Sequence, residues 1–190
     1  MTFDFTAARK NMFDSQVRTS DVTDPAILEA VRVVEREQLC PPDKQSLAYA
    51  DTEIPYGGGR YLMRPREAAK LLQALRPRAG ERALAIAAPY VAAVLEAMGL
   101  TVDRLEDGDL ATPVGGGYDV VVSEGAVTVA PPGWIGALAK GGRLAVVERN
   151  GPVGKAKLYT KADHGVGVRE VFDSTPPILS GFEPKPHFAF

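Results

Sequence analysis

Short hydrophobic runs alternate with helical patterns along the second half of the chain. Strand-like apolar runs cover residues 83–87, 100–105, 117–123 and 143–148. Helical segments at 90–98 and 131–139 follow the first and third of these runs. Two more alternating segments, 154–161 and 166–173, flank a turn-forming centre and predict an antiparallel hairpin. This order predicts an α/β fold with a mostly parallel sheet and a C-terminal hairpin.

The N-terminal residues 1–45 follow a helical pattern with one marked start signal. Asp24 is suited to cap a helix, and Pro25 fits its first position, because proline has no N–H to satisfy there. The apolar face that follows predicts a helix ending before Pro41.

A loop is expected over residues 46–66, followed by an amphipathic helix over 66–75. Within the loop, three consecutive glycines, Gly57–Gly59, favour a tight or mobile turn. Whether that turn closes over a ligand is left open. We expect one domain, with residues 1–80 as a helical and loop segment in front of a core over 81–190.

Composition narrows the classes of function. The net charge is −2, the isoelectric point is about 5.8 and no basic run occurs, which argues against nucleic-acid binding. The single cysteine, Cys40, excludes an internal disulfide and fits a reducing compartment. No apolar stretch reaches the roughly 20 residues of a membrane span, and the first residues do not form a signal peptide, so we expect a cytoplasmic protein. His164 and His187 have no partner at ligand spacing, so no metal is expected.

The turn between the first core strand and its helix carries the candidate chemistry. Nucleotide-binding α/β folds place a glycine-rich turn there, close to the ligand and to a helix N-terminus. Here the turn is Ala87–Pro89, and its Cβ atoms and proline predict a blunted binding loop. Tyr90 begins the helix. Glu106 follows the second strand, where a carboxylate binds ribose in such folds, although a solvated loop residue fits equally well. Glu124, after the valine-rich strand, is a further candidate ligand contact.

Several motifs spread over the chain resemble one known family. They are Gln16–Arg18, Glu35–Glu37, Ala48–Asp51, Tyr118–Val122 and Leu138–Leu144. Together they resemble the protein-L-isoaspartate O-methyltransferase family of class I methyltransferases. The resemblance implies a Rossmann-like fold, S-adenosyl-L-methionine as cofactor and isoaspartyl proteins as substrates. It places Asp51, Gly57 and Arg60 in the substrate loop and Tyr90, Glu106 and Glu124 at the cofactor.

The sequence departs from the family's pattern at the positions that carry chemistry. Met63 stands where the family has the serine hydroxyl beside the methyl-accepting carboxylate. The acidic residue and the glycines of the cofactor loop are replaced over Ala85–Pro89. Tyr118 follows Glu106 closely, where the family has a further helix and strand, so one edge strand and its helix are expected to be missing.

These departures lead to a main interpretation and two alternatives. We interpret the chain as a degenerate, non-catalytic member that binds no cofactor and acts as a binding or regulatory module through a protein partner or a homodimer. The first alternative is an active S-adenosyl-L-methionine-dependent protein O-methyltransferase with a remodelled pocket. The second alternative is a protein that binds another small ligand through Arg60, Arg64 or Glu124. For the arginines and for Asp51, a solvated surface or turn role fits the sequence as well.

Overall fold

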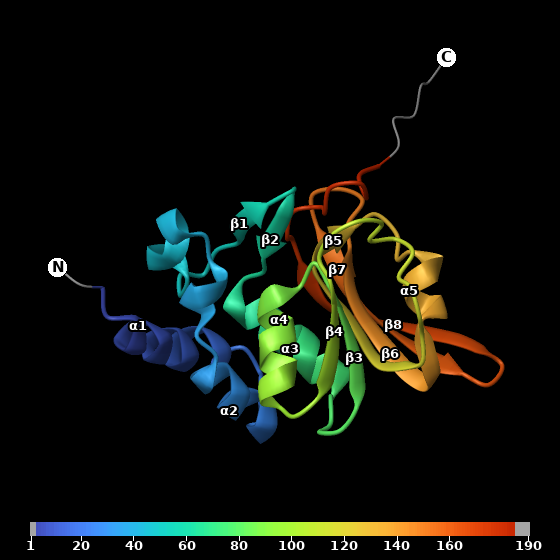
Figure 1. The fold of residues 1–190 in the computed structure, drawn as a ribbon, viewed down its shortest axis with the longest axis horizontal. Helices are drawn as coiled ribbons and strands as arrows, with labels where there is room; N and C mark the ends of the chain where they lie inside the picture. Colours follow the sequence, from blue (N-terminus) through green and yellow to red (C-terminus); the bar gives the residue numbers. More distant parts are fainter. Residues whose placement is uncertain (1–2, 185–190) are drawn as a thin grey trace, which may run out of the picture.

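The central sheet has six strands in the order β4-β3-β5-β6-β7-β8. The computed structural model describes residues 3–184, and Figure 1 shows the sheet with its covering helices. The strands are β3 (Arg82–Ile86), β4 (Thr101–Leu105), β5 (Tyr118–Val127), β6 (Leu138–Glu148), β7 (Gly154–Ala162) and β8 (Gly165–Ser174). β4, β3, β5 and β6 pair in parallel, and β7 and β8 continue the sheet in antiparallel pairing. The predicted sheet and hairpin are confirmed.

Helices cover both faces of this sheet. The helical segments are α1 (Phe5–Met12), a π-helix (Phe13–Val17), α2 (Pro25–Val33), two 3₁₀ helices (Arg36–Leu39 and Pro42–Leu47), α3 (Pro65–Leu75), α4 (Pro89–Ala97) and α5 (Pro132–Gly136). One hydrophobic core joins α1 to α4 to the sheet, and a second core around Trp134 of α5 lies on the other face (Figure 1). β5 is buried along almost its whole length because both of its faces are covered.

The helix start predicted at Asp24 is confirmed. Asp24 caps α2, and its Oδ1 accepts the backbone N–H of Ala26 at 2.9 Å. The expected helix end near Pro41 is wrong, because α2 ends at Val33 and Val34 is already extended, with ψ 124°. β-branched valines favour extended backbone, and the change of direction carries Arg36 into the core.

Two other expected boundaries need correction. The segment expected as a loop over 46–66 contains a hairpin, β1 (Ile54–Gly57) and β2 (Arg60–Leu62). Its turn uses the three glycines, which all have positive φ, a conformation that only glycine adopts at low cost. The helix expected over 131–139 covers only Pro132–Gly136, because β6 begins at Leu138.

The expected absence of an edge strand agrees with the topology. Between β4 and β5 the described chain forms no strand, and β4 is an edge of the sheet. The side chain of Trp134 holds the connecting segment, since its Nε1 donates to the carbonyl of Leu110 at 2.6 Å. The sequence also predicts that Phe188 and Phe190 dock on the domain, but both lie outside the described residues. The single-domain assignment stays a prediction.

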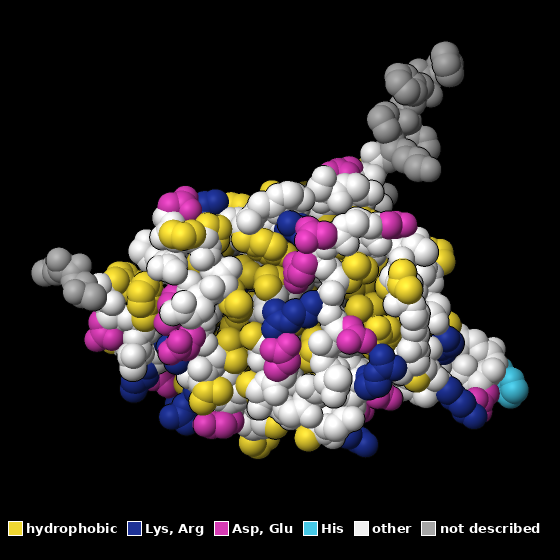
Figure 2. All heavy atoms as spheres, viewed as in Figure 1, with side chains coloured by type: hydrophobic (Ala, Val, Ile, Leu, Met, Phe, Trp, Pro, Cys, Tyr) yellow, Lys and Arg dark blue, Asp and Glu magenta, His cyan; other side chains and the backbone are white. Residues whose placement is uncertain are grey.

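The surface of residues 3–184 carries mixed charge. On the face in Figure 2, acidic and basic side chains are interspersed, with no broad gathering of Lys and Arg. Within the described range no helix is long and apolar enough to span a membrane. The same range holds no group of three or more His, Cys, Asp or Glu side chains placed to bind a metal ion.

Candidate functional site

Glu124 lies at the point where β5 stops pairing regularly with β6. The register shifts between Val122 and Ala126, and Gly125 adopts φ 113°. A Cβ at Gly125 would stand 2.7 Å from Leu179, so the close approach of the tail requires glycine there. This irregularity turns the side chain of Glu124 inward, where it is fully buried.

The carboxylate of Glu124 occupies the N-terminus of α4. Its Oε1 accepts the backbone N–H of Val91 at 2.7 Å, and its Oε2 accepts the backbone N–H of Met63 at 2.7 Å. The first N–H groups of a helix have no partner inside the helix, and they are the groups that bind anionic ligands in nucleotide folds. Here an acidic side chain of the protein itself takes the place of such a ligand.

A buried arginine completes this network. The guanidinium of Arg36 is fully buried and lies 4.4 Å from the ring centroid of Tyr90. Its Nε donates to the carbonyl of Ala48 at 2.8 Å, and its Nη2 donates to that of Met63 at 2.6 Å. Burial raises the pKa of Glu124 to about 7, against the opposing effects of Arg36 and of the N–H donors. Burial likewise raises the pKa of Tyr90 to about 12.

The turn between β3 and α4 is buried. Ala87 and Ala88 are completely buried, and Tyr90 is 1% exposed. Ala87 has φ 45°, so the turn adopts a left-handed conformation that suits glycine while carrying a methyl group. A cofactor held at this turn would need access from solvent and a free N–H at the helix start, whereas these residues are buried and the N–H of Val91 is bonded to Glu124. These residues therefore do not fit S-adenosyl-L-methionine in this conformation.

Glu106 lies in a more open part of the site. Its Oε2 accepts a hydrogen bond from the hydroxyl of Tyr56 at 3.0 Å, and burial raises its pKa. Its Oε1 is buried and makes no hydrogen bond of good geometry among the described residues, although the backbone N–H of Ala88 lies close enough to oppose the rise in the pKa of Glu106. Arg60 stacks on Tyr56 at 5.4 Å and pairs with Asp107 at 3.0 Å. The β1–β2 hairpin is thus fixed to the end of β4.

A hollow of about 330 Å³ lies beside these contacts. It is lined by Gly58, Arg60, Glu106, Asp107, Gly108, Asp109, Leu110, Ala111, Ser180, Gly181 and Phe182. Neither Glu124 nor the turn over residues 87–90 lines it. The candidate cofactor residues are therefore divided between a small open hollow near Glu106 and a closed network around Glu124 and Tyr90.

The substrate-loop candidates do not converge on one point. Asp51 is exposed and pairs with Arg66 at 3.3 Å, outside the hollow. The carbonyl of Gly57 accepts a hydrogen bond from Arg60 Nε at 3.3 Å. The turn of the hairpin packs on the tail, since a Cβ at Gly59 would stand 2.5 Å from Cβ of Ser180. The roles assigned to these residues and to Tyr90, Glu106 and Glu124 stay predictions.

Two residues of the site were missed by sequence reasoning. Arg36 lies within the motif Glu35–Glu37, and nothing local shows that its charge is buried, because its partners lie 12 and 27 positions away. Tyr56 contacts Glu106 across 50 residues. Its place between a proline and three glycines gave no functional signal.

Comparisons with known proteins agree on one family. The family model "Protein-L-isoaspartate(D-aspartate) O-methyltransferase (PCMT)" matches residues 7–105. The protein-L-isoaspartate O-methyltransferase of Methylorubrum populi is 30% identical over an alignment of 206 positions, which covers 92% of this chain and 96% of that protein. Protein-L-isoaspartate O-methyltransferase 1 of Rhodopseudomonas palustris is 33% identical over 170 residues, covering 75% and 69% of the two chains.

Solved structures share the fold. A Plasmodium falciparum protein described as a protein-L-isoaspartate O-methyltransferase, in complex with S-adenosyl-L-homocysteine, superposes with a TM-score of 0.72 at 14% identity, covering 94% of this chain and 99% of that one. Another structure of that description gives a TM-score of 0.71 at 19% identity, and the match spans 91% of this chain but 66% of that one. The class I methyltransferase-like fold is confirmed. The family-model match ends at Leu105, immediately before the segment where a helix and a strand were expected to be missing.

Proposed function

The chain belongs to the protein-L-isoaspartate O-methyltransferase family, and from this premise we propose that it is a member whose cofactor site is closed by its own side chains. It then acts as a binding or regulatory protein and not as a methyltransferase. The observation that carries this proposal is the buried carboxylate of Glu124, which accepts the N–H groups of Val91 and Met63. An anionic ligand would compete for those donors with an acceptor that is already in place.

The position of Met63 supports the same proposal. Its side chain is completely buried, and its backbone bonds to both Glu124 and Arg36. A thioether offers neither an O–H donor nor a strong acceptor to a carboxylate substrate. The interaction partner, another protein or a second copy of the chain, is part of this proposal.

An active S-adenosyl-L-methionine-dependent isoaspartyl O-methyltransferase with a remodelled pocket is the second candidate. The comparisons favour it over the first, because the relatives described above carry the enzyme's name and one was solved with S-adenosyl-L-homocysteine. The expectation that no cofactor binds gains no support from them. In this chain, the buried Oε1 of Glu106 beside the 330 Å³ hollow, which makes no hydrogen bond of good geometry among the described residues, favours the second candidate.

A methyl-transfer assay separates the two candidates. The purified chain is incubated with S-adenosyl-L-methionine and an isoaspartyl peptide, with the Methylorubrum populi relative as positive control. We expect no methyl ester above the level without protein. A Met63→Ser variant should remain inactive, because the closed network around Glu124 is unchanged. Peptide-dependent methyl transfer by the unmodified chain would overturn the proposal in favour of the enzyme.

A further inference from the structure

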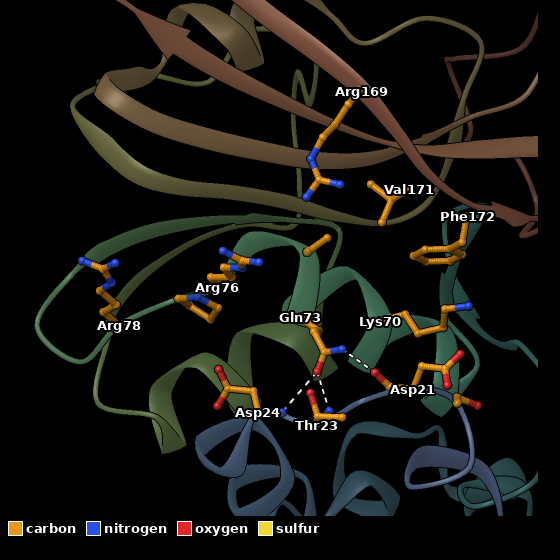
Figure 3. Close-up of a pocket in the computed structure, with 13 residues that line it drawn as sticks. Asp21, Thr23, Asp24, Lys70, Gln73, Arg76, Arg78, Arg169, Val171 and Phe172 are labelled. Carbon is orange, nitrogen blue, oxygen red and sulfur yellow. Dashed lines mark hydrogen bonds between the residues drawn. The ribbon is translucent and has the colours of Figure 1, made fainter.

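A second hollow lies between α3 and β8, away from the candidate cofactor site. Its volume is about 620 Å³, within the range of roughly 300–1,000 Å³ typical of small-molecule sites. Figure 3 shows its lining: Arg169 extends into it from β8, and Arg76 extends from the C-terminal end of α3. It shares no lining residue with the hollow beside Glu106. We call it the basic groove, after its cationic residues Lys70, Arg76, Arg78 and Arg169.

The cations of the basic groove have no direct ion-pair partner among the described residues. Within residues 3–184, none of the four forms an ion pair. Lys70 Nζ lies 4.4 Å from the ring centroid of Phe172, which does not neutralise its charge. Arg76, Arg78 and Arg169 also line an adjoining cavity of about 640 Å³. A protein with a net charge of −2 therefore concentrates free positive charge at one place.

The lining of the basic groove also holds two acidic residues, Asp21 and Asp24. Asp24 Oδ1 accepts the backbone N–H groups of Ala26 and Ile27, so its charge lies at the N-terminus of α2. Asp21, the other acidic residue of the lining, forms no ion pair among the described residues. Four cationic side chains thus line the basic groove together with two carboxylates. One of these, that of Asp24, accepts hydrogen bonds at the start of α2.

The wall of the basic groove is held in place by one side chain. Gln73 Oε1 accepts the backbone N–H groups of Thr23 and Asp24, at 2.6 and 3.2 Å, and Gln73 Nε2 donates to the carbonyl of Asp21 (Figure 3). These bonds join α3 to the segment before α2. A prearranged wall lowers the entropic cost of binding a ligand.

Arg76 is held in a strained backbone conformation. It ends α3 with φ 49° and ψ 57°, the left-handed position where glycine is the usual residue. A non-glycine residue is disfavoured there by about 1 kcal/mol. An arginine at this position extends its guanidinium into the basic groove at the expense of stability. The same turn places the carbonyl of Arg76 to accept a hydrogen bond from Arg143 Nη2 at 2.7 Å, and it leaves the exposed side chain of Arg76 beside the groove.

We propose that the basic groove binds a small ligand bearing phosphate groups, held between Arg76 and Arg169. Guanidinium groups match phosphate oxygens by paired, charge-assisted hydrogen bonds, and two of them can contact one phosphate group from different sides. Lys70 adds a third positive charge. The binding is independent of the closed or open state of the cofactor site, because none of its residues takes part.

Titration with inorganic pyrophosphate at low salt tests this proposal. We expect saturable binding, and we expect Arg76→Gly and Arg169→Gln each to weaken it by about tenfold or more, the usual effect of removing one charged hydrogen-bonding group. Arg32→Gln, which removes an exposed arginine outside the basic groove, should bind like the unmodified chain.

A second readout separates binding from folding. Arg76→Gly should raise the melting temperature while it weakens binding, because glycine relieves the left-handed strain. Absence of saturable pyrophosphate binding by the unmodified chain would overturn the proposal. Equal weakening by Arg32→Gln would overturn it too, since binding would then follow overall charge. So would binding of an acidic peptide at Arg76 and Arg169 in place of pyrophosphate.

Discussion

Replacement of Glu124 by alanine is expected to lower the free energy of unfolding by about 3–5 kcal/mol. The change leaves the buried N–H groups of Met63 and Val91 without an acceptor, at roughly 1–3 kcal/mol each. It also removes the electrostatic attraction between Glu124 and the buried charge of Arg36. Urea unfolding measures the loss. Glu29→Gln, an exposed glutamate on α2, is the matched control and should change stability by less than about 0.5 kcal/mol.

The pH dependence of stability gives this prediction a second readout. Because burial raises the pKa of Glu124 from 4.5 to about 7, the folded state holds the proton more tightly than the unfolded state. The stabilising contribution of that proton is complete below about pH 4.5 and is lost as pH rises through about 7. Glu124→Gln should therefore show a smaller fall in stability between pH 5 and pH 8 than the unmodified chain. A Glu124→Ala loss below about 1 kcal/mol, with an unchanged pH profile, would show that the carboxylate is not held as described.

Trp134→Ala is expected to destabilise the chain by about 3–5 kcal/mol, the usual range for removing a large buried aromatic side chain. The side chain of Trp134 is completely buried, its ring centroid lies 5.5 Å from that of Phe182, and its Nε1 holds the carbonyl of Leu110. The segment over residues 106–117 depends on this anchor. Urea unfolding should show the loss, and limited proteolysis should show faster cleavage within 106–117.

The milder Trp134→Phe variant serves as the control for this change. It keeps most of the ring packing and loses the hydrogen bond to Leu110, so a cost of about 1–2 kcal/mol is expected. If Trp134→Ala and Trp134→Phe cost the same, the packing in this core contributes little. Unchanged proteolysis in both variants would show that other contacts hold the segment over 106–117.

The elements that follow from local pattern could be predicted from the sequence. β3 and α4 appear as an apolar run followed by a helical segment, and the β7–β8 hairpin surrounds a clear turn, so each carries its own signal. The helix start at Asp24 is likewise local. The class of fold follows from the order of these elements.

The closed network could not be predicted, because it depends on contacts between distant segments. Glu124 bonds to groups 33 and 61 positions away, and its inward direction depends on the register shift in β5. The sequence predicts Glu124 just after a strand over 117–123, but β5 continues to Val127 and the partners of Glu124 are protein N–H groups. The burial of Arg36 is hidden in a stretch rich in charge, Glu35–Glu37. The sequence shows that alanines stand at 87 and 88 in place of glycines. It does not show that the carboxylate of Glu124 takes the place of a ligand at the start of α4.

Calorimetric titration of the purified chain with S-adenosyl-L-methionine and S-adenosyl-L-homocysteine tests the closed site most directly. A closed site predicts no saturable heat and no thermal shift at millimolar ligand, because Glu124 already occupies the N–H groups at the start of α4. Binding tighter than about 100 μM, roughly 5.5 kcal/mol, would contradict it and would favour an active methyltransferase.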